Sequence, residues 1–230
     1  MKFGIVTFPG SNCDYDAFHA IVDLLGEQAT YLWHKSHDLQ GSDVIILPGG
    51  FSYGDYLRAG AIARFSPVMR EVMEHARNGS PVIAICNGFQ IACEAGLLPG
   101  ALMRNEKLRF VSETVRLRVE QTGTLFTNRY QRFDVLRIPI AHGEGRYVAP
   151  DDVLEQLEDE GHVIFRYVNA EGEADAESNP NGSVRNIAGI VNSGGNVLGM
   201  MPHPERASEA LLGSADGLAI FQSVLERVGV

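Results

Sequence analysis

The stretch that decides the fold is Ser80-Pro-Val-Ile-Ala-Ile-Cys-Asn-Gly-Phe-Gln90. Apolar residues with strand character run directly into Cys86, and a helical pattern begins at Phe89. A residue at such a strand-to-helix turn lies on a sharp bend, with its side chain exposed above the sheet. The free N–H groups and the dipole of the following helix favour a thiolate, which is the nucleophilic form of cysteine. The sequence therefore predicts that Cys86 is a nucleophile.

Strand and helix patterns alternate on the N-terminal side of this turn. Ser11 or Asn12 is expected to cap the first helix, which ends at Gly26. Continuous apolar strands that alternate with helices are typical of a parallel sheet covered on both faces. The predicted strands are 2–8, 29–33, 43–47 and 82–85, and a second helical region spans 60–78.

The chain after this turn has a different pattern. Residues 114–120 alternate apolar and charged side chains, which is typical of a half-exposed antiparallel strand. Residues 187–191 and 197–201 flank Asn192-Ser-Gly-Gly-Asn196, a strong hairpin signal. No repeat or linker divides the chain, so we expect a single domain of residues 1–230. Its predicted fold class is α/β, with a mostly parallel central sheet, helices on both faces and an antiparallel extension in the second half.

Composition excludes several classes of function. The chain has 230 residues, 45% hydrophobic and 21% charged, as in ordinary globular proteins. Its net charge of −10 argues against a surface for nucleic acid or an anionic membrane. No apolar run approaches the ~20 residues of a membrane span. Three cysteines, an odd number without metal-type spacing, indicate a reducing compartment, and the cytoplasm is expected.

A candidate base lies in Met200-Met-Pro-His-Pro-Glu-Arg206, directly after an apolar strand. In an extended backbone His203 and Glu205 project from the same side, so the carboxylate orients the imidazole. Nucleophile, base and orienting acid are the three parts of a Cys-His-Glu triad. The alternative is a rigid proline-rich surface turn, and the presence of Cys86 favours the triad.

Acyl transfer also needs donors for an oxyanion, and the backbone N–H groups of Gly50 and Asn87 are the candidates. An ordinary turn after a strand is the alternative for Gly49-Gly50. Of the other thiols, Cys93 is expected to be buried in a helix, and Cys13 to lie in a capping region without a histidine or glutamate partner.

His142 and Glu144 form a second His-x-Glu pair, which with the first would offer four ligands to zinc or iron. The spacing between the pairs matches no metal motif, so no metal is expected. The chain has no Gly-rich phosphate loop, so it gives no sign of binding ATP or a dinucleotide by itself.

Taken together, these motifs resemble the class I glutamine amidotransferases. More closely, the chain resembles the glutaminase subunits of phosphoribosylformylglycinamidine synthase, over its whole length. One departure is Ala84, where related amidotransferases often have glycine. The resemblance rests on Gly10-Ser-Asn-Cys-Asp14, the Pro48–Gly60 segment, Cys86-Asn-Gly-Phe-Gln90, Gly96-Leu-Leu-Pro-Gly100, Ala141-His-Gly-Glu-Gly-Arg-Tyr147 and Pro-His-Pro-Glu205.

The resemblance implies glutamine hydrolysis through a thioester on Cys86. It also implies that Gln90 contacts the bound glutamine and that the segment from His142 to Tyr147 borders the same pocket. The ammonia would pass to a large synthetase subunit, which would hold ATP and Mg. A small third subunit is expected as well, and no cofactor in this chain.

Three rival functions remain open. Peptidases, deglycases and redox sensors carry a cysteine at the same turn, often followed directly by histidine, where this chain has Asn87. Another class I amidotransferase would serve a different synthetase. A binding subunit would leave the triad unused.

Overall fold

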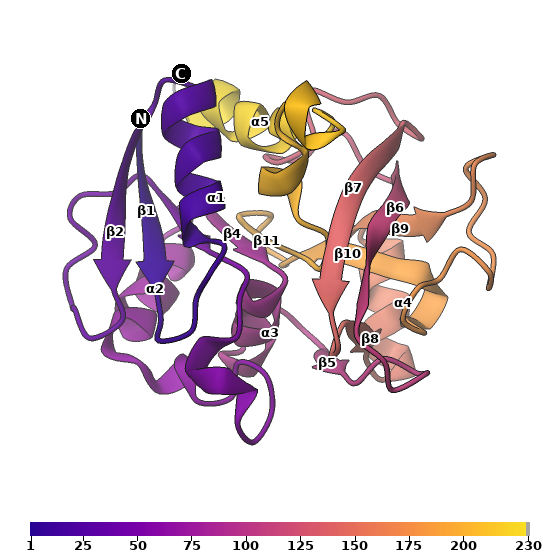
Figure 1. Cartoon of the computed structure of the whole chain (residues 1–230), viewed down its shortest axis with the longest axis horizontal. Coiled ribbons are helices and arrows are strands. Elements are labelled where there is room, and N and C mark those ends of the chain that lie inside the picture. The colour runs from indigo at the N-terminus through magenta and orange to yellow at the C-terminus, as the bar shows by residue number, and fades with distance from the viewer. Residues whose placement is uncertain (229–230) are drawn as a thin grey trace.

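The computed structural model describes residues 1–228, which form one nine-stranded sheet and a small two-stranded sheet (Figure 1). The strand order of the large sheet is β2-β1-β3-β4-β11-β10-β9-β6-β7. Its first five strands run parallel and the other four extend it antiparallel. Their bounds are β1 (Lys2–Thr7), β2 (Gln28–Trp33), β3 (Val44–Leu47), β4 (Val82–Ile85), β6 (Val111–Val119), β7 (Val135–His142), β9 (Val163–Val168), β10 (Ile187–Val191) and β11 (Val197–Met200), with β5 (Ala101–Met103) and β8 (Arg146–Val148) paired separately.

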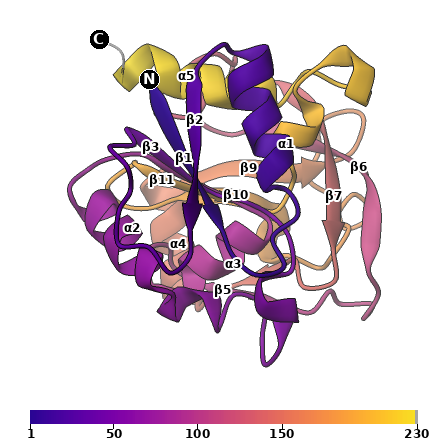
Figure 2. The ribbon, with the colours of Figure 1, turned by 60° about the vertical axis from the view of Figure 1, so that its left-hand side comes forward.

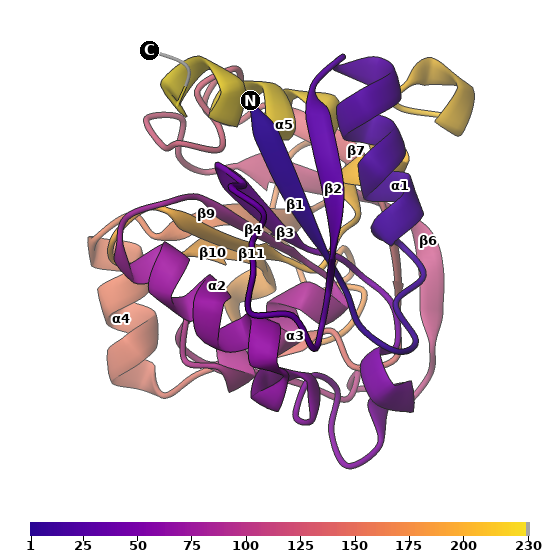
Figure 3. The ribbon, with the colours of Figure 1, turned by 90° about the vertical axis from the view of Figure 1, so that its left-hand side faces the viewer.

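Helices cover both faces of the large sheet, as predicted. Figure 3 shows α1 (Asp14–His19) and α5 (Leu218–Val228) on one side, and α2 (Pro67–Arg77), α3 (Asn87–Glu94) and α4 (Asp151–Asp159) on the other. The sheet is strongly twisted, so that β1 and β2 cross the direction of β9 and β10 (Figure 2). No helix within residues 1–228 has the length and apolar character to cross a membrane. The fold class is therefore confirmed; the single-domain range of 1–230 stays a prediction, and its residues 229–230 lie outside the described part.

The predicted cap of the first helix is wrong. The helix begins at Asp14, Cys13 occupies the capping position without a side-chain hydrogen bond to the helix, and the last turns widen to a π-helix over Ala20–Leu24. Ser11 instead forms a bridge with Gly50, and its hydroxyl accepts a hydrogen bond from the Phe8 N–H at 3.1 Å. This bridge holds the chain before α1 against the end of β3.

The three central strands β3, β4 and β11 are buried along their whole length. Ala84 of β4 lies between Leu47 of β3 and Gly199 of β11 in register, so its methyl group is part of the core. Helix α3 packs on these strands. A Cβ at Gly199 would lie 2.3 Å from Cδ2 of Phe89, a helix residue, which shows how closely strand and helix approach.

We expect Gly199→Ala to lower the free energy of unfolding by about 1–3 kcal/mol, because the added methyl overpacks the core beneath α3. The matched control is Gly123→Ala, where a Cβ meets nothing within 4 Å, and its effect is expected within about 0.5 kcal/mol. Urea unfolding of both variants checks this. Equal stability of the two variants would contradict the close packing of β11 on α3.

Candidate active site

Cys86 sits on a strained turn between β4 and α3. Its φ of 51° and ψ of −106° are uncommon for a residue with a side chain. The surroundings hold this conformation, because the Cys86 N–H donates to Met200 O at 2.8 Å and the Cys86 carbonyl accepts from Gln90 N at 3.2 Å. The first turn of α3 passes so close to β3 that a Cβ at Gly88 would lie 1.9 Å from Leu47 O. The predicted strand-to-helix turn is therefore present, and its contacts with Met200 of β11 and Leu47 of β3 hold its conformation.

His203 follows β11, and its Nδ1–H donates to Glu205 Oε1 at 2.6 Å. Both side chains are about 1% exposed. The predicted pairing is present, but the predicted extended backbone is wrong, because Pro204–Ala207 form a 3₁₀ turn and His203 is the capping residue before it. Burial by itself would lower the pKa of His203, but the Glu205 carboxylate and the nearby Cys86 raise that pKa well above its usual value. The imidazole therefore favours its charged form beside Cys86.

The Pro-Gly-Gly end of β3 leaves space for this histidine. A Cβ at Gly49 would lie 2.6 Å from His203 Cε1, so a side chain here would displace the ring. Gly50 lines the same cavity as Cys86, and the Asn87 N–H belongs to the first turn of α3, where N–H groups have no acceptor within the helix. The two N–H donors expected from sequence thus belong to the two turns that border Cys86.

A cavity of about 190 Å³ opens in front of Cys86. The amide of Gln90 is fixed in its wall, because Nε2 donates to Glu144 O at 2.5 Å and Oε1 accepts from Asn87 Nδ2 at 2.8 Å. The cavity combines polar side chains with the aromatic rings of Phe51 and Phe110 in its lining. It is lined by Gly50, Phe51, Asp55, Cys86, Gln90, Phe110, Ala141, His142, Gly143 and Glu144.

His142 lines this cavity as a neutral imidazole. Burial lowers its pKa to about 3, and the nearby His203 adds to the shift. Asn181 Nδ2 lies 3.0 Å from His142 Nε2, and the Asn181 side-chain oxygen accepts from Ser183 N at 3.0 Å, which orients the amide. Because an amide nitrogen only donates, Nε2 accepts and Nδ1 carries the hydrogen. That Nδ1–H has no hydrogen-bond partner within the described residues.

One expectation about the segment from His142 to Tyr147 needs correction. His142, Gly143 and Glu144 border the cavity, but Tyr147 turns into the core, where its ring stacks on Phe89 and its hydroxyl donates to Pro99 O at 2.9 Å. The four-ligand set of two His-x-Glu pairs is not brought together either. Within residues 1–228, the close group of candidate metal ligands pairs His203 and Glu205 with Cys13 instead.

Sequence reasoning missed two features of the site. Cys13 was expected to lack partners, yet it lies buried beside His203 and Glu205 because the bridge at Gly50 folds its segment against β3. Asp55 also lines the cavity, and its pKa is raised to about 6 by burial and by the charge of Glu144. Neither contact leaves a sequence pattern, since the partners are far apart in the chain.

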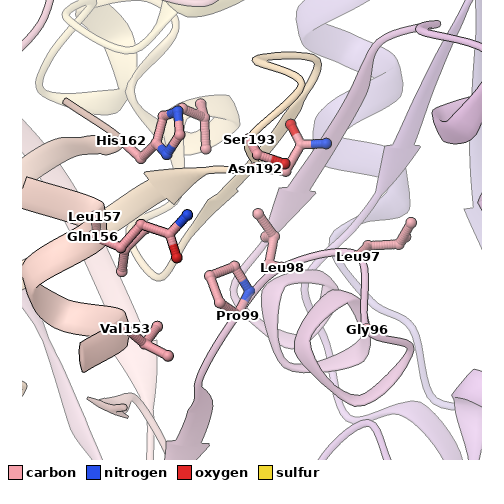
Figure 4. Close-up of a pocket in the computed structure, with 11 residues that line it drawn as sticks. Gly96, Leu97, Leu98, Pro99, Val153, Gln156, Leu157, His162, Asn192 and Ser193 are labelled. Atoms are coloured by element: carbon pink, nitrogen blue, oxygen red, sulfur yellow. The ribbon is translucent and has the colours of Figure 1, made fainter. Parts of the chain in front are cut away.

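A larger cavity of about 400 Å³ lies at the other end of β11, near the hairpin and the C-terminal end of α3 (Figure 4). Two of its polar side chains are already paired: Gln156 donates to Glu160 Oε1 at 3.0 Å, and His162 Nδ1 lies 3.2 Å from Glu160 Oε2. It contains none of the candidate nucleophile, base or oxyanion groups. The reactive chemistry of the chain is therefore concentrated in the smaller cavity.

A cysteine on a strained turn, a buried histidine–glutamate pair and N–H donors at one edge of an α/β sheet are the parts of an acyl-transfer site. Glutamine amidotransferases are a class of proteins with such a site. Residues 1–217 match the family model of the CobB/CobQ-like glutamine amidotransferase domain. The chain belongs to this glutamine amidotransferase family and, within it, is similar over its full length to the phosphoribosylformylglycinamidine synthase subunits PurQ.

Those relatives are close. The PurQ subunit of Chlorobaculum tepidum is 60% identical over 98% of this chain and 96% of its own length. That of Salinibacter ruber is 56% identical over 100% of this chain and 97% of its own length. A chain in the structure of PurLQS from Thermotoga maritima is 45% identical with a TM-score of 0.86, covering 98% of this chain and 97% of that one.

More distant structures share the fold alone. The glutaminase domain of Trypanosoma brucei CTPS with bound acivicin is 12% identical with a TM-score of 0.62, over 98% of this chain and 94% of that chain. At this identity only the arrangement of sheet and helices is comparable.

We expect Gly88→Ala to lower glutamine hydrolysis at least about a hundredfold, because the new methyl meets the Leu47 carbonyl and forces Cys86 off its turn. Backbone atoms cannot move aside as flexible side chains do, so stability also falls, by about 3 kcal/mol. Gly123→Ala is again the control. Steady-state kinetics and thermal melting check both effects, and wild-type activity in Gly88→Ala would contradict the strained geometry of the turn.

Proposed function

We propose that this chain is the glutaminase subunit of phosphoribosylformylglycinamidine synthase, acting in purine biosynthesis. The observation that carries the reaction is the placement of Cys86, which lines the cavity, beside the buried His203–Glu205 pair. The similarity to PurQ subunits over the full length of the chain supports this particular synthetase over others.

The first half of the proposed reaction forms a thioester. The Cys86 thiolate attacks the side-chain amide carbon of glutamine, and the N–H groups of Gly50 and Asn87 stabilise the oxyanion. The protonated His203 then donates its Nε2 proton to the departing amine, which leaves as ammonia. Glu205 holds the ring in place by accepting from Nδ1.

The second half restores the enzyme. His203, now neutral, removes a proton from water, and the hydroxide attacks the thioester carbon. Cys86 leaves as the thiolate, glutamate is released, and the imidazolium is regenerated for the next cycle.

Asp55 and Glu144 support a free amino acid as the substrate. Both line the cavity, and their mutual repulsion contributes to the raised pKa of Asp55. The α-ammonium of glutamine between them would relieve this repulsion, which the uncharged amide of an internal peptide residue would not. We assign glutamine contacts to Gln90 and to the unpartnered Nδ1–H of His142 as well.

The ammonia product requires a partner that uses it. We propose delivery to a large synthetase subunit that holds ATP and Mg, with a small third subunit, in the cytoplasm. The mouth of the cavity supports docking of that synthetase, because Phe51 and Phe110 stack there and the neighbouring Tyr56 and Leu57 are exposed. Apolar side chains around a reactive cavity are typical of a partner surface.

We expect Cys86→Ala to abolish glutamine-dependent amidine formation by the assembled synthetase and to spare formation from added ammonia. The substitution removes the nucleophile and leaves the partner's chemistry intact. Product formation with each nitrogen source measures this, with Cys93→Ala as the matched thiol control because Cys93 lies in α3, outside the cavity. Undiminished use of glutamine by Cys86→Ala would refute the proposal.

We expect the KM for glutamine to rise as the pH falls through about 6, because the pKa of Asp55 is raised to about 6 and only its ionised form attracts an ammonium. Asp55→Asn should raise KM about tenfold at pH 8, which is the effect of one charge-assisted hydrogen bond at a partly exposed site, and flatten this pH dependence.

Asp152→Asn, on the exposed face of α4, is the control for the loss of one charge. A KM for Asp55→Asn equal to that of the wild-type chain at pH 8 would show that Asp55 does not contact the substrate.

A further inference from the structure

A second thiol approaches the histidine of the proposed triad. Cys13 comes from the start of α1, whereas His203 and Glu205 follow β11, and one ligand atom from each lies within 4.8 Å of the others. All three side chains are buried, with exposed fractions of 2%, 1% and 1%. The proposed reaction uses the second and third residues and has no role for Cys13.

The donor set matches one kind of cation. A thiolate sulfur, an imidazole nitrogen and a carboxylate oxygen are the ligands of zinc, whereas magnesium and calcium prefer oxygen. Zinc bonds of ~2.0–2.3 Å at tetrahedral angles place ligand atoms roughly 3.3–3.7 Å apart. Side-chain shifts of about 1 Å would reach this geometry from the observed spacing.

Two further observations point to a ligand here. His203 Nε2 and Glu205 Oε2 are buried and have no hydrogen-bond partner within residues 1–228, so each carries an unused lone pair or donor. Cys13 is also supported from behind: Arg206 Nη2 donates to Cys13 Sγ at 3.1 Å, and Arg206 Nε donates to Asp16 Oδ2 at 2.8 Å. Burial raises the pKa of the Cys13 thiol, and the neighbouring His203 and Arg206 offset part of that rise, so a metal would have to displace the thiol proton.

We propose that Cys13, His203 and Glu205 form an inhibitory zinc site that silences the glutaminase. Binding forms Zn–S, Zn–N and Zn–O bonds, and two protons leave to solvent, one from the Cys13 thiol and one from the His203 nitrogen that binds the metal. A metal on Nε2 takes the lone pair that the reaction needs. A metal on Nδ1 replaces the proton that His203 shares with Glu205. The chain thereby has a metal-bound state in which Cys86 has no base.

The inhibition rests on the proposed function, but the binding does not, so the binding is tested without turnover. The protein is full-length Cys86→Ala, in which Cys13 and Cys93 are the remaining thiols. The probe is Co²⁺, whose thiolate complexes give a near-ultraviolet charge-transfer band and strong visible bands when tetrahedral. We expect these bands to appear and to bleach when Zn²⁺ is added.

Adding Cys13→Ser to Cys86→Ala should remove the thiolate band, and adding Cys93→Ser should keep it. Absence of the band in Cys86→Ala, or its survival in the Cys13→Ser variant, would overturn the site. Should Cys13→Ser fail to fold, Glu205→Gln in the same background replaces it, and its Co²⁺ affinity should fall at least tenfold.

The inhibition is tested by glutamine hydrolysis in the otherwise wild-type chain. We expect Zn²⁺ to inhibit reversibly, with activity restored by a chelator, and Cys13→Ser to need at least tenfold more Zn²⁺ for half-inhibition relative to its own metal-free rate. Equal zinc sensitivity in the two proteins would show that Cys86 and His203 alone bind the metal, and would overturn the inhibitory role of Cys13.

Discussion

The parallel pairing of β4 with β3 on one side and β11 on the other is the interaction on which the structure of the site depends. Because the three strands run in one direction, their carboxyl ends meet at one edge of the sheet. The nucleophile turn, the Pro-Gly-Gly turn and the histidine turn each begin where one of these strands ends. Residues separated by more than a hundred positions in the chain are thereby held around a single cavity.

The second constraint is the close approach of backbone segments, which is possible only where glycine carries no side chain. Gly88 lets α3 start directly against the Leu47 carbonyl, and Gly49 leaves the volume in which the His203 ring lies. The strain at Cys86 persists because both backbone groups of that residue are hydrogen-bonded and the strand before it is fully buried. Rigidity of the core is therefore what maintains the reactive geometry.

The ionisable side chains of His142, His203 and Glu205 are buried, so a charge on any of them is shielded from solvent. A buried carboxylate beside a buried imidazole is costly unless the two pair, and the 2.6 Å hydrogen bond between them provides that pairing. His142 is held neutral a short distance away, so one histidine favours the charged form and the other the uncharged form. The two rings differ because only His203 faces a carboxylate.

The sequence by itself determined the periodic and the local parts of this protein. The alternation of apolar strands with helices predicted the sheet and its two covered faces, and the turn at Cys86 and the His-x-Glu pair were predicted because short-range patterns specify them. Only the tertiary structure decided which distant groups share the cavity. Cys13 meets His203 through the bridge between Ser11 and Gly50, and Asp55 meets Glu144 across a folded loop. Such contacts depend on strand order and loop packing, which follow from the burial of the whole core and leave no pattern in neighbouring residues.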